Sequence, residues 1–269
     1  MASKEELLAE MEAYRAYYER VRKETGTPSI FEVFWAGALS GVRMLDTGSP
    51  DETVGDWMQS PLVTRLFSKE NAYRMLVDEI QLCKSCELYA HRQHPVPGSG
   101  PLRAELMLIG EAPGKNEDEQ GFPFVGEAGK LLDELLLTFM SRQRDTVFVA
   151  NTVKCRPPNN REPQPEENAA CHHFLHRQIL LVNPKMILCL GKHAASWIIG
   201  TTPDKLTIKD VHGKIYWYEH VPVMVMPHPA AYLRDKNAWH KPTIETLGWA
   251  NWILGQPYEA GFWIKETPK

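Results

Sequence analysis

The 269-residue chain carries a net charge of −4 at pH 7, and 43% of its residues are hydrophobic. That is enough apolar material for a full core in one large domain, or in one domain with an appendage. The negative balance comes from residues 1–70, where 8 Lys and Arg face 12 Asp and Glu. The remainder of the chain is neutral, so overall charge gives no attraction to nucleic acid, and a DNA or RNA binder would need a local basic face.

No apolar run approaches the length needed to span a bilayer, and the N-terminal stretch is charged from Lys4 onward. We therefore expect neither a membrane anchor nor a signal peptide, and we expect a cytoplasmic location. The five cysteines are an odd number, which argues against a disulfide framework in a chain without an export signal. Ligation of a metal or a cluster is the better first hypothesis for them.

Residues 1–72 predict a helical extension. Residues 4–24 carry apolar and aromatic side chains at helical spacing, with charges between them, up to Gly26 and Pro28. An apolar patch spans residues 30–39, and residues 58–75 show a helical pattern again. The extension contains no chemical motif, so it would serve either as a packing cap or as a surface for a partner or substrate.

Residues 73–269 predict an α/β domain. A helical pattern at residues 76–82 runs into Cys83 and Cys86, and a Pro/Gly loop follows at residues 94–101. Four short apolar runs then alternate with helical patterns, which is typical of a parallel sheet with crossover helices. The apolar runs are residues 106–109, 147–150, 186–190 and 221–226, and the helical patterns are residues 130–140, 165–181 and 193–199. Residues 214–219 could add a hairpin or an edge strand.

Polar or glycine-rich segments follow each of these four runs, and the carboxyl ends of parallel strands are where ligands bind. The longest is Gly110–Gly129, GEAPGKNEDEQGFPFVGEAG, and loops of that length inside a domain are usually functional. It is not a phosphate-binding loop, because the spacing from Gly110 to Gly114 is too short and Asn116 follows the lysine where Ser or Thr is needed. The others start at Asn151, Gly191 and Pro227.

The cysteines form a pair two apart, Cys83 and Cys86, followed by Cys155 and then Cys171. Four thiolates from three separate segments can enclose either a tetrahedral zinc ion or a cubane iron–sulfur cluster. Cys189 lies in the middle of an apolar run, where a small buried side chain is expected.

Residues 73 to about 254 resemble the family 4, iron–sulfur type of uracil-DNA glycosylase. The matching text is CKSC, LIGEAPGKNEDEQGFPFVGEAGKLL, NTVKCRPPNNREP, the helix with Cys171, and PHPAAYLR, in that order. The resemblance implies a 4Fe–4S cluster on Cys83, Cys86, Cys155 and Cys171. It also implies a three-layer α/β/α domain with a four-stranded parallel sheet, and hydrolysis of an N-glycosidic bond in DNA.

The resemblance also implies the roles of the pocket residues. The enzyme must extrude a base from the duplex and hold it by stacking and edge hydrogen bonds. Phe124 would stack on the base, and the Asn151 amide would pair with N3–H and O4 of uracil, which distinguishes uracil from cytosine. Glu117 would lie near C5 of the base, whereas Asp118, Glu119 and Glu127 are expected to be solvated loop acids.

Cleavage would depend on two residues. His228 would donate a hydrogen bond to the developing O2 oxyanion of the base. Glu111 would orient the attacking water and offset the positive charge on the sugar. Ala112 stands where the classical enzymes carry an aspartate, so Glu111 must compensate.

DNA itself would be held by helix starts near Gly129 and Lys192 and by basic side chains. The family commonly has leucine at the position of Tyr232, whereas here the leucine is Leu233, so either could be the wedge that enters the base stack. The basic candidates for phosphate contacts are Arg156, Arg161, Lys192 and Arg234.

Three functions fit these features. The first is a monofunctional, monomeric, nucleoid-associated glycosylase that removes uracil from DNA during repair. The second keeps the chemistry but acts on a modified pyrimidine, such as glucosylated hydroxymethylcytosine of phage DNA, in antiviral defence. The third is an inert iron–sulfur protein for DNA binding or electron transfer, against which the presence of Glu111, Asn151 and His228 counts.

Overall fold

The computed structural model describes residues 68–255, and the chain divides into two compact units, residues 1–85 and 86–269. The predicted helix at residues 4–24 and the apolar patch at 30–39 lie outside the described residues, so the helical extension stays a prediction. In the first unit, α5 (Lys69–Leu82) begins where the Ser68 hydroxyl accepts a hydrogen bond from the Asn71 amide, at 3.1 Å. A serine in this position satisfies one of the free N–H groups of the first turn.

The second unit is built on a five-stranded sheet, which the alternation of apolar runs and helical patterns predicts in all but one strand. Four strands are parallel and coincide with the four predicted apolar runs, which confirms the α/β fold class. The fifth strand is antiparallel to its neighbour and forms one edge, within the stretch that could add an edge strand. In sheet order the strands are β2 (Phe148–Asn151), β1 (Leu106–Gly110), β3 (Met186–Leu190), β5 (Val221–Met226) and β4 (Tyr216–Tyr218).

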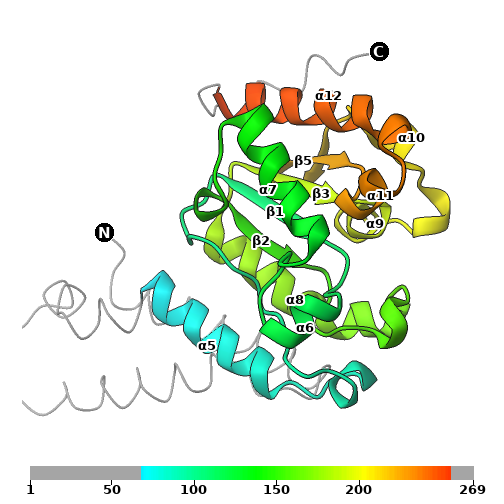
Figure 1. Cartoon of the computed structure of the whole chain (residues 1–269). Helices are drawn as coiled ribbons and strands as arrows, with labels where there is room; N and C mark the ends of the chain where they lie inside the picture. The colour runs from blue at the N-terminus through cyan, green and yellow to red at the C-terminus, as the bar shows by residue number, and fades with distance from the viewer. Residues whose placement is uncertain (1–67, 256–269) are drawn as a thin grey trace, which may run out of the picture. The chain divides into compact units, whose positions relative to one another are not determined.

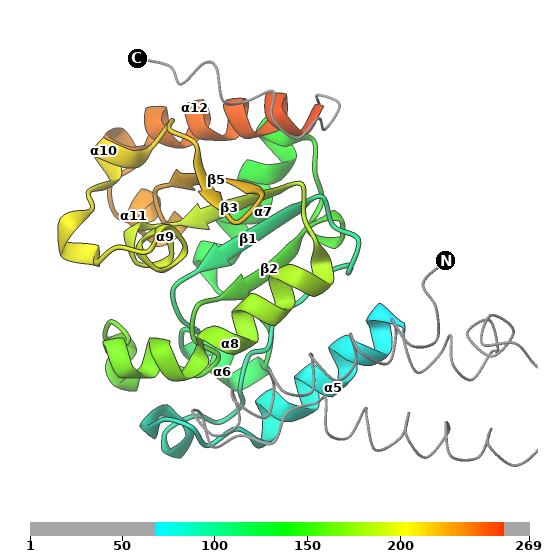
Figure 2. The ribbon, with the colours of Figure 1, turned by 180° about the vertical axis from the view of Figure 1, so that it is seen from behind.

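Helices cover both faces of this sheet (Figure 1). On one face lie α7 (Glu127–Met140), α11 (Pro229–Arg234) and α12 (Lys236–Gly255). Figure 2, seen from behind, shows the other face with α8 (Pro165–Val182) and α9 (Lys192–Ile199). The remaining short helices are η1 (Glu87–Ala90), α6 (Lys115–Gln120), η2 (Arg144–Thr146), η3 (Pro158–Asn160), η4 (Pro203–Lys205) and α10 (Ile208–Val211). Among the described residues, none of the helices combines the length and apolar character that crossing a bilayer requires.

The core follows from the alternation of side chains along the strands. Leu106 and Leu108 of β1 pack in the cluster beneath α7 and α12, together with Leu132 and Leu136 of α7. The intervening side chains therefore point to the opposite face, and every residue of the four parallel strands is buried. Strands that are buried on both faces read as continuous apolar runs, which is why the sequence pattern finds them.

One edge of the sheet is covered by an irregular segment, residues 95–100, which we call the edge segment. Ser99 and Val149 of β2 exchange both main-chain hydrogen bonds, at 2.9 and 2.8 Å. Gly98 and Gly100 have positive φ angles of 133° and 135°, and a Cβ at Gly100 would lie 2.2 Å from the Val147 carbonyl oxygen. Only glycine allows so close an approach to the strand in that conformation.

Candidate active site

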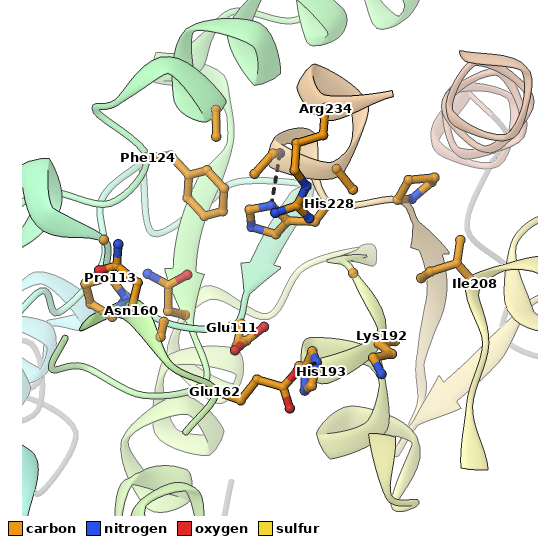
Figure 3. Close-up of a pocket in the computed structure, with 18 of the residues that line it drawn as sticks. Glu111, Pro113, Phe124, Asn160, Glu162, Lys192, His193, Ile208, His228 and Arg234 are labelled. Atoms are coloured by element: carbon orange, nitrogen blue, oxygen red, sulfur yellow. Dashed lines mark hydrogen bonds and ion pairs between the residues drawn. The ribbon is translucent and has the colours of Figure 1, made fainter. Parts of the chain in front are cut away.

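The carboxyl ends of the parallel strands meet at a cavity of about 840 Å³. It lies where the chain order of the strands reverses, since β1 has β2 on one side and β3 on the other. The cavity brings together nine of the residues predicted for the site, and Figure 3 labels five of them. These nine are Glu111, Ala112, Glu117, Phe124, Asn151, Arg161, Lys192, His228 and Arg234.

The Gly110–Gly129 loop contains a short helix, α6, which its glycine-rich sequence did not predict. Glu117 stabilises the loop, because its carboxylate accepts hydrogen bonds from the main-chain amides of Gly114, Val125 and Gly126, at 3.1, 2.9 and 3.0 Å. Glu117 thus lines the cavity, but its carboxylate oxygens are hydrogen-bonded to the loop itself. Its placement near C5 of a base stays a prediction.

The prediction that Asp118 is a solvated loop acid is wrong. Its side chain is buried, and its carboxylate accepts a hydrogen bond from the Gln93 amide at 2.9 Å. That contact joins α6 to a segment 25 residues earlier, which no local pattern reveals. Glu119 and Glu127 are exposed, as expected.

Phe124 occupies the cavity in an unusual backbone conformation, with φ at 55°. Such angles are rare for bulky residues and occur where the surroundings hold them in place. Arg144 donates hydrogen bonds to the carbonyl oxygens of Pro123 and Phe124, and a Cβ at Gly129 would lie 1.8 Å from the Phe124 oxygen. Gly129 is therefore buried and serves to admit this turn of chain; it does not line the cavity.

Asn151 ends β2 with a side chain that is 1% exposed. Its Oδ1 atom is buried and has no hydrogen-bond partner among the described residues, and both this atom and the Phe124 ring lie next to Gly110. A Cβ at Gly110 would lie 2.4 Å from Oδ1 and 2.6 Å from Cζ of Phe124. An unpaired buried amide oxygen is costly unless a ligand satisfies it. The arrangement therefore suits a ligand that carries an N–H group.

His228 follows β5 and faces Phe124 across the cavity, with ring centroids 5.8 Å apart (Figure 3). Its Nδ1 atom accepts a hydrogen bond from the Ala230 amide at 3.1 Å, so the ring proton must reside on Nε2. Burial, followed by repulsion from Arg234, lowers the pKa of His228 to about 4. The imidazole is thus neutral at pH 7 and presents one N–H donor.

Glu111 follows β1, and its main-chain oxygen accepts hydrogen bonds from the Thr152 hydroxyl at 2.7 Å and the Val153 amide at 3.2 Å. Burial, together with the nearby charge of Glu162, raises the pKa of Glu111 to about 7, and Lys192 opposes this shift. A carboxyl group that titrates near neutral pH is suited to proton transfer.

Glu162 and His193 also line the cavity, although the sequence patterns did not assign them a role. The Nε2 atom of His193 lies 2.9 Å from a carboxylate oxygen of Glu162, and Figure 3 shows the pair next to Glu111. Burial lowers the pKa of His193, and the negative charge of Glu162 opposes this shift. His193 lies shortly after the end of β3, and Glu162 lies in the connection between β2 and α8; these positions were the only signal that could have identified them.

The four basic candidates for DNA contacts are divided. Lys192 and Arg234 line the cavity, but Arg156 does not, and its side chain donates to Asn160 at 2.7 Å. Arg161 reaches the cavity wall but forms a two-pronged ion pair with Glu167, at 2.6 and 2.8 Å. Lys192 and Arg234 are therefore the better placed cations.

Tyr232 and Leu233, the two candidates for the wedge, differ in exposure. Tyr232 is 6% exposed, and its hydroxyl lies 2.7 Å from Nδ1 of His240. Leu233 is 52% exposed at the end of α11. Tyr232 would have to leave the core and break a hydrogen bond to reach DNA, whereas Leu233 is accessible without rearrangement.

The cysteines fall in both compact units, with Cys83 in the first and the others in the second. In the described part of the chain, no three His, Cys, Asp or Glu side chains are arranged to hold a metal ion. Cys155 and Cys171 are buried and accept hydrogen bonds from the Arg92 guanidinium at 3.1 Å and the Lys154 amide at 3.3 Å. Burial lowers the pKa of Lys154 to about 8, and the two cysteines oppose that shift. Nitrogen donors directed at sulfur suit thiolates.

The sequence is similar to one known family of proteins. A family model described as "Uracil DNA glycosylase superfamily" matches residues 97–248. The type-4 uracil-DNA glycosylase of Sulfurisphaera tokodaii is 46% identical over 165 residues, which cover 60% of this chain and 75% of that protein. The type-4 enzyme of Archaeoglobus fulgidus is 45% identical, covering 59% and 81%. That of Thermotoga maritima is 40% identical, covering 64% and 88%.

Proposed function

The chain belongs to the uracil-DNA glycosylase superfamily, and from that premise we propose that it hydrolyses the N-glycosidic bond of a uracil flipped out of DNA. The product would be an abasic site, as in base-excision repair. DNA is the partner that this chemistry requires. The observation that carries the proposal is the buried, unpaired Oδ1 atom of Asn151 beside Phe124, in the same cavity as Glu111 and His228.

Recognition of uracil follows from the donors and acceptors of the Asn151 amide. Its unpaired oxygen would accept N3–H of uracil, and its NH₂ group would donate to O4. Cytosine presents an acceptor at N3 and a donor at N4, so it would meet like groups at both positions and leave buried atoms unpaired. Phe124, whose ring lies close to this amide, would stack on the base.

Departure of the base leaves negative charge on its O2 atom. His228 supports this step because its proton is fixed on Nε2 by the hydrogen bond from Ala230 to Nδ1. With its pKa lowered to about 4, the ring stays neutral and acts as a hydrogen-bond donor without giving up its proton. Stabilisation of a developing oxyanion by one such donor contributes about 10²–10³ in rate.

The sugar becomes electron-poor as the base departs, and water must attack it. Glu111, in its ionised form, would orient this water and offset the positive charge. Its pKa of about 7 keeps a substantial ionised fraction at neutral pH. Glu111 therefore supplies the charge that Ala112, standing in place of an aspartate, cannot supply.

Four cysteines, Cys83, Cys86, Cys155 and Cys171, would hold a 4Fe–4S cluster. The hydrogen bonds from Arg92 and Lys154 to sulfur support thiolate character at Cys155 and Cys171. Lys154 also has a buried ammonium group with no carboxylate partner among the described residues, which favours negative charge nearby. The cluster would fix the surrounding loops, since no step of the hydrolysis requires an electron.

Contacts to DNA would come from Lys192 and Arg234 at the cavity rim, and the exposed Leu233 would fill the gap left by the flipped base. The enclosed Tyr232 would instead support α11 from beneath. This assignment separates the two wedge candidates by their accessibility.

The test measures abasic sites after incubation with three DNAs of one sequence that contain uracil, cytosine or glucosylated hydroxymethylcytosine. We expect release from the uracil substrate alone. Activity confined to the glucosylated substrate would replace uracil with a modified pyrimidine, and inactivity on all three would favour an inert DNA-binding protein.

Matched variants test the residue roles. His228→Leu, which removes the donor, should lose about 10²–10³ in rate with unchanged DNA affinity, whereas His91→Leu, at an exposed histidine, should behave as the wild type. Wild-type rates in His228→Leu would refute its role. Iron, sulfide and zinc analysis of the purified protein tests the cluster, and zinc in place of iron would overturn it.

A further inference from the structure

Lys154 is buried in a network that the proposed reaction does not use. Its side chain is 1% exposed, and its ammonium group donates to the Asn151 main-chain oxygen at 2.7 Å and to Gln178 Oε1 at 2.6 Å. Gln178, on α8, is also fully buried, and its amide nitrogen donates to the Pro97 oxygen at 2.6 Å. Neither side chain can touch DNA, so any effect on the reaction must pass through other residues.

The network completes the outer edge of β2. Along a strand, carbonyl groups two residues apart point to the same side. The Val149 carbonyl is paired with the Ser99 amide of the edge segment, and the Asn151 carbonyl, two residues on, is paired with the Lys154 ammonium. Lys154 thus takes over from the edge segment at the last residue of the strand, where the base-recognition amide is carried.

Main-chain contacts hold Lys154 itself on two sides. Its amide donates to the Cys171 sulfur at 3.3 Å, and its carbonyl accepts from the Val96 amide at 2.7 Å. One residue therefore connects a cysteine of α8, the edge segment and the end of β2. Lysine suits this position because one ammonium group can serve acceptors on two separate elements.

We propose that Lys154 is a positioning residue that fixes the Asn151 end of β2 for base recognition and ties it to the cysteine-bearing segments. The inference rests on the proposed function, because it assigns Asn151 to the base. Misplacement of a recognition group by about 1 Å costs on the order of 10²-fold in rate. Loss of the ammonium would leave the Asn151 carbonyl unpaired and free to shift.

The experiment uses Lys154→Met, which keeps most of the length of the side chain and removes its donors. We expect kcat/KM on uracil DNA to fall about 10- to 100-fold. The matched control is Lys185→Met, since Lys185 pairs with Glu105 on the surface, at the amino end of β3, and should leave the rate unchanged. Iron content and thermal stability are measured for each variant.

Two readouts separate positioning from a merely structural role. The first is binding to DNA with 2′-fluoro-2′-deoxyuridine, which resists cleavage, compared with the same DNA containing 2′-deoxycytidine. Lys154→Met should lose the preference for the uracil analogue while keeping its affinity for the deoxycytidine DNA. The second is the double variant with Asn151→Ala, in which Lys154→Met should cause little further loss of rate. A fully additive loss, or an unchanged preference, would overturn the proposal.

Gln178 provides a test that keeps the lysine, should Lys154→Met fail to fold. Gln178→Leu removes one acceptor of the ammonium and should reduce the rate and the preference in the same direction. Wild-type behaviour of Gln178→Leu would count against the network. An inactive wild-type protein would instead refute the proposed function, so the two failures are distinguishable.

Discussion

The acid that titrates near neutral pH, Glu111, gives the sharpest test of the reaction. Its pKa of about 7 means that about a tenth of the carboxyl is ionised at pH 6 and about nine-tenths at pH 8. If the ionised form orients the water, kcat/KM for uracil release should rise about tenfold over this range. The perturbation that isolates the cause is Glu162→Gln, which removes the neighbouring charge.

Glu162 is the second cause of the raised pKa, after burial, so its removal should lower the pKa of Glu111 by a part of the shift. The kcat/KM of the variant should therefore be higher than that of the wild type at pH 6, by a factor of at most about 10. At pH 8 the two values of kcat/KM should be equal. Glutamine still offers an oxygen to His193, so that contact can survive.

The assay is the initial rate of abasic-site formation under kcat/KM conditions from pH 5 to pH 9, at constant ionic strength. Glu245→Gln, at a partly exposed glutamate on α12, removes the same charge outside the cavity and should leave the profile unchanged. A wild-type rate that is flat from pH 6 to pH 8, or a Glu162→Gln profile displaced to higher pH, would refute the role of ionised Glu111.

Three further outcomes are expected. Glu111→Gln should raise the free energy of unfolding at pH 8 by up to about 3 kcal/mol. The reason is that Glu111 ionises near pH 4.5 in the unfolded chain but only near pH 7 in the folded chain, so the wild type loses stability as the pH rises from 4.5 to 7. Below pH 4.5, denaturant unfolding should find no difference between the two proteins. Leu233→Ala should slow release from duplex DNA more than from single strands, and equal slowing would contradict a wedge. Gly129→Ala should displace Phe124 and reduce kcat/KM about 10- to 100-fold, which side-by-side kinetics with Gly248→Ala, an open position, would check.

Sequence patterns predicted the elements that bury apolar side chains. The four runs from residue 106 to residue 226 became the parallel strands because both faces of the sheet are covered. The helix α6 was not predicted because it shows no apolar periodicity. The Glu117 carboxylate stabilises it through hydrogen bonds from three main-chain amides. Local reading failed for Asp118 for a similar reason, since its partner lies 25 residues away.

The sequence indicated correctly which residues line the cavity where a residue lies at or directly after the end of a strand, and their roles stay predictions. Asn151 and His228 stand at strand ends, so the topology brings them to one cavity. Glu162 and His193 form a pair in the structure, and the sequence of neither segment predicts that the two side chains meet. The choice between Tyr232 and Leu233 likewise depended on burial, which the helix spacing of α11 did not decide.

The edge segment protects the open edge of β2 from pairing with another copy of the chain. An open sheet presents unpaired main-chain groups at each side, which can recruit a strand from another molecule. Here β2 is covered by residues 95–100, which come about 50 positions before it in the chain, and the opposite side ends in β4, only three residues long. A chain shortened past residue 100 would expose the Val149 amide and carbonyl, and with them a ready template for aggregation.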